Sequence, residues 1–290
     1  MHRPWLRLCK LVWRVQRVAR WGRMLYGEKR DKALLRLAAR GAGEVLDLET
    51  IMPYSPARLV LQRKDLTTEA VFAWAHSAEY AALHQTRRRI LHPHELARYD
   101  AFTAPRRKSS FLLGRYVAKQ ALAVLLREPQ YANIEIASGV FTQPIVKFPT
   151  AEPVEVSITH AGELACALAF PQMHPMATDA ERLDTDNLEA MKSQILPGEL
   201  DPQRLPLLSE SVRCTIIWTA KEALSKVLKC GMMCPFSILE TIELRQEGPC
   251  YVGYFRNFGQ FKFHAWVVKD HVIAIVLPKW TTMMFDVAPR

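Results

Sequence analysis

Two long amphipathic helices, each followed by short strand-like segments, most restrict the fold of this 290-residue chain. Residues 109–127 and 209–229 repeat apolar side chains every three or four positions, the period of a helix with one buried face. We expect the first helix to end before Pro129 and the second to end with Gly231 in a C-cap position. Shorter helices are predicted at 79–91 and 95–102, and strands at 59–61, 71–74, 134–136, 145–148, 154–158, 164–170, 176–181, 238–244, 251–255, 261–268 and 272–277.

These elements fall into two halves of similar size, each with one long helix and a small antiparallel sheet. We therefore predict an α+β protein made of two similar α/β lobes, residues 58–173 and 174–290. Residues 1–57 are predicted to be a basic helical extension and linker, because 41–57 contain Gly and Pro and no basic residue.

The positive charge of the chain is confined to its N-terminal part. The net charge is +10, and residues 1–40 hold twelve Lys and Arg against Glu28 and Asp31, so the other residues sum to zero. No run of about eighteen apolar residues occurs, so no transmembrane helix is expected. Arginines interrupt the N-terminal apolar run, which excludes a secretory signal and favours a cytoplasmic protein.

Residues 4–40 are predicted to form a basic amphipathic helix, and three interpretations stay open. The helix packs on its own domain, or lies upstream of a later start at Met24 or Met52. Alternatively, it binds a membrane surface or an anionic partner peripherally. The third interpretation is nucleic-acid binding, but charge alone gives unspecific contacts, so no specific nucleic acid is expected.

The segment WTAKEALSK places Trp218, Glu222 and Lys226 four residues apart on one helix face. An ordinary Glu–Lys pair on a helix surface is the simpler interpretation of this stripe.

Asp179 and Glu181 alternate in an extended segment, so their carboxylates point the same way. Like charges this close favour a shared cation, and Mg²⁺ is commonly held by carboxylates together with substrate phosphate. The alternative is a solvent-exposed acidic loop, since Asp184 and Asp186 follow.

His160 ends a strand that also carries the hydroxyl residues Ser157 and Thr159, and could contact a phosphate or ribose or be a structural histidine. Arg107, Arg115 and Lys119 form a cationic group suited to phosphate, or else a solvated helix face. The six cysteines include no CxxC pair, and no further Cys or His stands at ligand spacing, so zinc is not expected. Dispersed thiols in a chain without an export signal indicate a reducing cytoplasm.

In order and spacing, these segments resemble the Sfp-type 4′-phosphopantetheinyl transferases over residues 71–277. That family shows an Arg-rich helix, a Ser-x-Ser-His strand, a Gly-x-Asp-x-Glu strand and a Trp-x-x-Lys-Glu-Ala-x-x-Lys helix. Here they stand at 95–119, 157–160, 177–181 and 218–226, and the last is a full match.

The resemblance implies two lobes related by a pseudo-two-fold axis, with coenzyme A and Mg²⁺ in the cleft between them. The implied reaction transfers 4′-phosphopantetheine from coenzyme A to a serine of an acyl- or peptidyl-carrier protein and releases 3′,5′-ADP, as in secondary metabolite biosynthesis. A monomer is expected, because one chain supplies both lobes. The implied Mg²⁺ ligands are Asp179, Glu181 and Glu222; the catalytic residues are Glu222, Lys226 and His160; and the coenzyme A contacts are Arg107, Arg115, Lys119, Thr159, His160 and Lys226.

Departures from the family pattern indicate a divergent member. Ala177, Thr178 and Ala180 replace the glycine and the two β-branched residues of the acidic strand. Thr142-Gln143-Pro144 stands where Gly-Lys-Pro is usual, which removes a cation that Lys147 could replace. A degenerate homologue that binds coenzyme A or a carrier protein without turnover is the alternative function.

Overall fold

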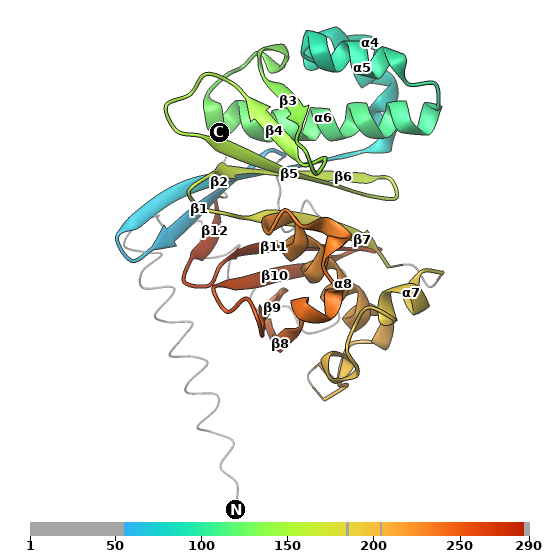
Figure 1. Cartoon of the computed structure of the whole chain (residues 1–290), viewed down its shortest axis with the longest axis vertical. Helices are drawn as coiled ribbons and strands as arrows, with labels where there is room; N and C mark the ends of the chain where they lie inside the picture. Colours follow the sequence, from blue (N-terminus) through green and yellow to red (C-terminus); the bar gives the residue numbers. More distant parts are fainter. Residues whose placement is uncertain (1–54, 184–185, 204, 287–290) are drawn as a thin grey trace, which may run out of the picture. The chain divides into compact units, whose positions relative to one another are not determined.

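The computed structural model describes residues 55–183, 186–203 and 205–286, which lie in the unit Val45–Arg290 (Figure 1). Its helices are α4 (Tyr80–Ile90), α5 (Pro93–Ala101), α6 (Pro105–Leu126), α7 (Leu188–Lys192) and α8 (Glu210–Val227). Its strands are β1 (Ala57–Arg63), β2 (Leu66–His76), β3 (Glu135–Ser138), β4 (Pro144–Lys147), β5 (Val154–Ala161), β6 (Leu164–Pro171), β7 (Ala177–Arg182), β8 (Thr241–Glu247), β9 (Cys250–Phe255), β10 (Phe261–Val268), β11 (His271–Pro278) and β12 (Thr282–Asp286). The predicted basic helix and the start sites Met24 and Met52 lie outside the described residues.

Two antiparallel five-stranded sheets form the body of this unit, with strand orders β12-β1-β2-β6-β5 and β7-β11-β10-β9-β8. Alternation along β6 explains how the first sheet is covered on both faces. Ala165, Ala167 and Ala169 pack under α6, while Cys166 and Leu168 face the second sheet. The small alanines allow the helix to approach the sheet closely.

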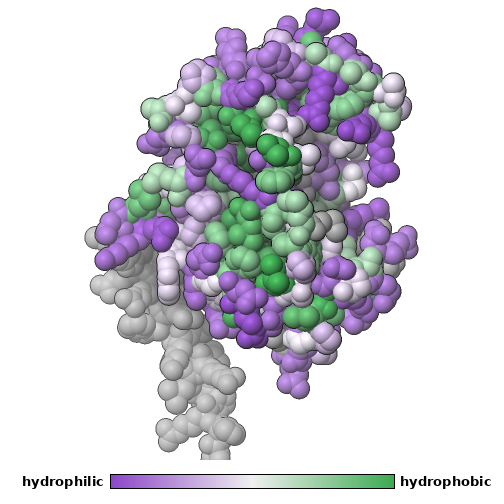
Figure 2. All heavy atoms as spheres, viewed as in Figure 1, coloured by the Kyte–Doolittle hydropathy of each residue, from purple (hydrophilic) through white to green (hydrophobic). Residues whose placement is uncertain are grey.

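The second sheet is built in the same way. Val272, Ala274 and Val276 of β11 pack against α8, while Ile273 and Ile275 join the core that both sheets share. The layers therefore run helix, sheet, sheet, helix (Figure 1). On the face shown in Figure 2, hydrophobic side chains gather in the middle and hydrophilic ones dominate the outer margins.

The edge strands β5 and β7 join the two sheets. The Ser157 hydroxyl donates to the Thr178 carbonyl (3.1 Å) and accepts from the Thr178 amide (3.2 Å). These bonds place the end of β5 beside the acidic residues of β7.

A buried Lys–Glu pair recurs in both halves. Lys119 of α6 bonds Glu95 of α5, and Lys221 of α8 bonds Glu199 of the short 3₁₀ helix Pro197–Leu200 (2.7 Å). Both glutamates end a similar sequence, Leu-His-Pro-His-Glu at 91–95 and Ile-Leu-Pro-Gly-Glu at 195–199. Each also accepts the amide of the residue three positions earlier and one from a later strand, at Ile136 or Thr241.

The predicted α+β class is confirmed, and the pseudo-two-fold axis stays a prediction. One strand departs from the expected lobes: β12, which the sequence did not predict, lies within the expected second lobe (174–290) but pairs with β1 in the first sheet.

The predicted C-cap at Gly231 is wrong. Helix α8 ends at Val227 with Leu228 as its cap, and Lys229 takes the left-handed conformation (φ 55°) expected of a glycine. No helix among the described residues is long and apolar enough to cross a membrane.

Candidate active site

The predicted acidic residues lie on two elements that pack against each other, β7 and α8. Asp179 and Glu181 are two positions apart on β7 and so share one side of the strand. Helix α8 begins at Ser209, whose hydroxyl accepts the Val212 amide (3.3 Å), and it carries Glu222 on the stripe that the sequence predicted.

The helix stripe contacts both strand carboxylates. The Trp218 indole donates from Nε1 to Glu181 Oε1 (3.0 Å), and Lys226 Nζ donates to Asp179 Oδ1 (2.6 Å). Trp218 and Lys226, one helical turn before and after Glu222, are thus both hydrogen-bonded to β7. Lys226 does not form the helix-surface pair with Glu222 that the simpler interpretation required.

The three carboxylates are close enough to influence one another's pKa values. Burial, together with the charges of Asp179 and Glu181 and against that of Lys226, raises the pKa of Glu222 to about 7. Burial also raises the pKa of Glu181, again with a contribution from Asp179. Like charges held together in this way favour either a proton or a cation among them.

The carboxylate oxygens of Asp179, Glu181 and Glu222 are ligands of the kind that a divalent metal prefers, although they are not as close together as in a bound site. Asp179 is 4% exposed, and its Oδ2 atom is buried with no hydrogen-bond partner among the described residues. Within the described ranges, the oxygens of Asp179, Glu181 and Glu222 do not all lie within 4.8 Å of one another. The cluster therefore offers several hard oxygen ligands, of which Asp179 Oδ2 is buried and has no hydrogen-bond partner among the described residues.

Thr159, expected to contact coenzyme A, instead positions Asp179. Its hydroxyl donates to Asp179 Oδ1 (2.7 Å) and accepts from the Ala180 amide (3.3 Å). Because the side chain is 5% exposed, it supports the carboxylate from the first sheet rather than presenting itself to a ligand.

A pocket of about 240 Å³ lies beside the cluster, between α6 and β5. It is lined by Arg98, Phe102, Arg107, Ser110, Phe111, Gly114, Arg115, Ile158 and His160. Three guanidinium groups in one pocket favour an anionic ligand. Lys226 connects the pocket to the acidic cluster, because its ammonium also contacts the carbonyl of Ile158 (3.4 Å).

Gly114 allows His160 to lie against α6. A Cβ at position 114 would come within 2.6 Å of His160 Cε1. In this position His160 Nε2 lies 2.9 Å from the Ser110 carbonyl, which can only accept, so Nε2 carries the proton.

Burial lowers the pKa of His160, and the charges of Lys226 and Arg115 lower it further, against the Ser110 hydrogen bond. A neutral imidazole bonded through Nε2 has only the acceptor Nδ1 free. This arrangement suits a hydroxyl donor such as a ribose better than the phosphate that the resemblance implies.

The cationic residues expected on α6 have different environments. Arg107 lines the pocket and lies over the Phe102 ring (4.9 Å). Arg115 also lines it, while its Nε lies 3.1 Å from Glu95 Oε1.

Lys119 does not reach the pocket. Its side chain is fully buried and donates to Glu95 and to the Ile90 carbonyl (2.8 Å). The expected phosphate contact by Lys119 is therefore wrong for this structure. Lys147 does not replace the missing cation of the Gly-Lys-Pro turn at the pocket either, since it pairs with Glu135 (3.5 Å).

Sequence reasoning missed Arg98 and Gly114. Arg98 lies on α5, and only the packing of α5 against α6 brings it to the same pocket as Arg107 and Arg115. Gly114 matters because it lacks a side chain, and a glycine inside a long helix was the available signal.

Comparison with known proteins finds a family match over the part of the chain that contains β7, α8 and the second sheet. The family model of the 4′-phosphopantetheinyl transferase superfamily matches residues 175–276. The holo-[acyl-carrier-protein] synthase of Onion yellows phytoplasma (strain OY-M) is 31% identical over 102 residues, which are 31% of this chain and 80% of that protein.

Solved structures of small synthases are also similar. The holo-(acyl-carrier-protein) synthase of Bacillus anthracis str. Ames, in complex with CoA (3′,5′-ADP), is 21% identical with a TM-score of 0.33, covering 39% of this chain and 96% of that one. The Helicobacter pylori enzyme in complex with coenzyme A is 18% identical with a TM-score of 0.31, covering 36% and 99%.

The matched residues include Asp179, Glu181, Glu222 and Lys226, the whole acidic cluster and its lysine. On the family match and the curated relative, the chain belongs to the 4′-phosphopantetheinyl transferase superfamily.

Proposed function

We propose that this protein is an Sfp-type transferase that moves 4′-phosphopantetheine from coenzyme A to a serine of an acyl- or peptidyl-carrier protein, with Mg²⁺, and releases 3′,5′-ADP. The observation that carries the proposal is the junction of an acidic cluster in the second lobe with a cationic pocket in the first, linked by Lys226. The match to the curated relative spans 102 residues, less than the predicted second lobe, so the additional first lobe and its pocket favour the two-lobed subtype.

The cationic pocket would hold the nucleotide part of coenzyme A. Arg98 and Arg107 face the pocket with no carboxylate partner among the described contacts, and Arg115 shares its charge with Glu95. Guanidinium groups bind phosphate through paired hydrogen bonds. The free acceptor of His160 would take a ribose hydroxyl, so one pocket serves both the phosphates and the sugar.

The metal would be held by Asp179, Glu181 and Glu222. The unpartnered Oδ2 of Asp179 and the raised pKa values of the two glutamates suit these carboxylates to a cation. Bound there, Mg²⁺ would supply positive charge beside the pyrophosphate of the substrate. Trp218 and Thr159 keep two of the three carboxylates in place.

Glu222 would accept the proton of the carrier serine. Its carboxylate belongs to the acidic cluster beside Lys226 and would take the proton as the serine oxygen attacks. The serine oxygen bonds to the phosphorus that bears pantetheine, the bond from that phosphorus to the bridging oxygen breaks, and 3′,5′-ADP leaves with the electron pair. Lys226 would neutralise or protonate the departing phosphate, and Asp179 holds its ammonium beside the pocket.

The carrier protein would bind to a local cationic surface, since residues 41–290 carry no net charge. The arginines at 87–89 end α4, and Arg88 and Arg89 are exposed. An acidic carrier would be steered toward such a patch. Because one chain provides both the pocket and the acidic cluster, we propose that a monomer is active.

The test is incubation with coenzyme A, Mg²⁺ and several apo carrier proteins, followed by mass spectrometry of the carriers. We expect a mass gain of one phosphopantetheine and an equal amount of 3′,5′-ADP, and neither without Mg²⁺. Coenzyme A binding without any mass gain would support the alternative, a degenerate homologue that binds but does not turn over.

A further inference from the structure

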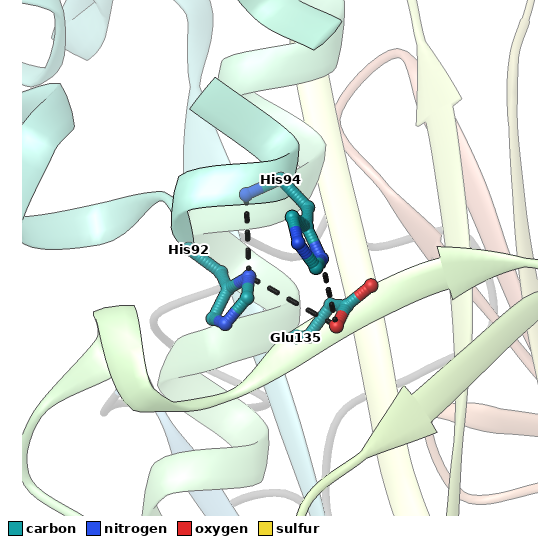
Figure 3. A group of neighbouring side chains, drawn as sticks. All are labelled: His92, His94 and Glu135. Atoms are coloured by element: carbon teal, nitrogen blue, oxygen red, sulfur yellow. Dashed lines mark hydrogen bonds and ion pairs between the residues drawn. The ribbon is translucent and has the colours of Figure 1, made fainter. Parts of the chain in front are cut away.

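Two histidines and a glutamate meet at a second place, outside the candidate active site (Figure 3). His92 caps the N-terminus of α5, His94 lies in its first turn, and Glu135 is the first residue of β3. His94 Nδ1 is 3.3 Å and His92 Nδ1 is 4.0 Å from Glu135 Oε2. One ligand atom from each residue lies within 4.8 Å of the other two.

The backbones that carry these side chains are fixed by a buried carboxylate. Glu95 Oε2 accepts the His92 amide (2.9 Å), and Glu95 Oε1 accepts the Ile136 amide (3.1 Å). Glu95 is 3% exposed and is neutralised by Lys119. The approach of α5 to the start of β3 is therefore set by the interior of the lobe, which leaves the three surface side chains preorganised.

The donor set selects the kind of metal. Two imidazoles and one carboxylate with an open fourth position are typical of Zn²⁺, whereas Mg²⁺ prefers oxygen ligands. Ligand atoms about 2.0–2.1 Å from a tetrahedral Zn²⁺ lie about 3.3 Å from one another. The His94–Glu135 separation of 3.3 Å already has this value.

The remaining contacts leave room for an ion. Lys147 lies 3.5 Å from Oε1 of Glu135, while both histidines face Oε2. His92 Nδ1 accepts the His94 amide at 3.3 Å, a long hydrogen bond that metal ligation would replace. The side chain of His94 is 76% exposed, which gives an ion a path from solvent.

We propose that His92, His94 and Glu135 form a Zn²⁺ site. The ion joins α5 to the hairpin of β3 and β4. The same helix and hairpin also meet at Arg98, which donates to the Ser138 hydroxyl (2.7 Å) and lines the cationic pocket. Zinc at this position stabilises the wall of the pocket without contacting its ligand. The inference does not depend on the proposed function, because it is tested by binding alone.

The experiment is calorimetric titration of the full chain with ZnCl₂ in buffer containing millimolar Mg²⁺, which occupies the oxygen donors of the acidic cluster. We expect one equivalent of Zn²⁺ to bind. His94→Ala should weaken this binding at least about tenfold, the lower limit even for an outer-shell change. His76→Ala, which alters another exposed histidine, should leave it unchanged.

Substitution with Co²⁺ gives a second measurement, because the visible absorption of Co²⁺ reports the geometry of the site that it occupies. Co²⁺ in the protein should give the intense visible absorption of a tetrahedral site, and Glu135→Gln should abolish it while the far-UV circular dichroism stays the same. The inference is overturned if no stoichiometric Zn²⁺ binds, or if wild type, His94→Ala and Glu135→Gln behave alike.

Discussion

The long helices α6 and α8 are built into their lobes in the same way, yet only one of them carries the proposed chemistry. Lys119 and Lys221 are both fully buried, and each forms an ion pair with a glutamate, Glu95 or Glu199. Each glutamate also accepts a backbone amide from a later strand. The next residue is Gln120 on α6 and Glu222 on α8. Glu222 faces Asp179 and Glu181, whereas α6 contributes Gly114 and arginines to a cationic pocket.

The comparison separates the residues that hold a lobe together from those that act on a ligand. The buried pair is present in both lobes and belongs to the scaffold. Anion binding is assigned to the first lobe, and metal binding and proton transfer to the second. Variants in the first lobe should therefore lose coenzyme A affinity, whereas variants in the second lobe should lose the rate of transfer.

The largest expected effect is on transfer by the second lobe. Glu222→Gln removes the proposed base and a metal ligand, so we expect carrier modification to slow by about 10²–10⁴-fold. The measurement is the rate of carrier mass gain. Glu210→Gln, an exposed change in the first turn of the same helix, is the matched control and should retain wild-type activity. Equal rates for the two variants would remove Glu222 from the mechanism.

The buried pairs should affect stability and should do so in both lobes. Lys221→Met leaves the buried Glu199 without its cation, which costs about 3–5 kcal/mol. Lys119→Met should cost less, because Arg115 still lies 3.1 Å from Glu95. Urea unfolding measures the loss. The double change Lys221→Met with Glu199→Gln should recover part of the loss, because both members of that ion pair are then neutral. A loss confined to one lobe would show that the two pairs are not equivalent.

Adding a single methyl group at position 114 should weaken coenzyme A binding in the cationic pocket. Gly114→Ala forces His160 away from α6, since the new Cβ would lie 2.6 Å from its ring. We expect coenzyme A to bind about tenfold more weakly, a change of about 1.4 kcal/mol. Titration calorimetry measures this affinity. Gly198→Ala, whose Cβ would meet nothing within 4 Å, is the control and should bind as wild type does. Unchanged binding in Gly114→Ala would place the ligand elsewhere.

The smallest effect is a pH dependence of stability in metal-free protein. The pKa of Glu222 is raised from its ordinary value to about 7, so its ionisation opposes folding and stability is lost as pH rises through 7. At about pH 8, Glu222→Gln should therefore melt about 2–4 °C higher than wild type, the shift for about 1 kcal/mol in a protein of this size. The difference should shrink at pH 5.5 and when Mg²⁺ is added to wild type. A Tm difference independent of pH would contradict the assigned pKa.

The acidic cluster was predictable because helical and strand periodicity fix which side chains share a face. Trp218, Glu222 and Lys226 had to form one stripe, and Asp179 had to point with Glu181. The strand and helix positions were predictable for the same reason.

The pocket and the buried pairs were not predictable, since they depend on packing between distant segments. Lys119 looks like a surface cation until Glu95, 24 positions away, is placed beside it. His92 and Glu135 are joined only by the meeting of α5 and β3. The short strand β12 has few alternating residues and is defined by its partner β1.

The division of tasks between the lobes is tested most directly by steady-state carrier modification as a function of coenzyme A concentration in Gly114→Ala and Glu222→Gln. We predict that Gly114→Ala raises KM for coenzyme A with kcat close to wild type, because it removes binding common to ground and transition states. Glu222→Gln should lower kcat with little change in KM. The reverse pattern, or the same pattern in both variants, would contradict the assignment of binding to one lobe and chemistry to the other.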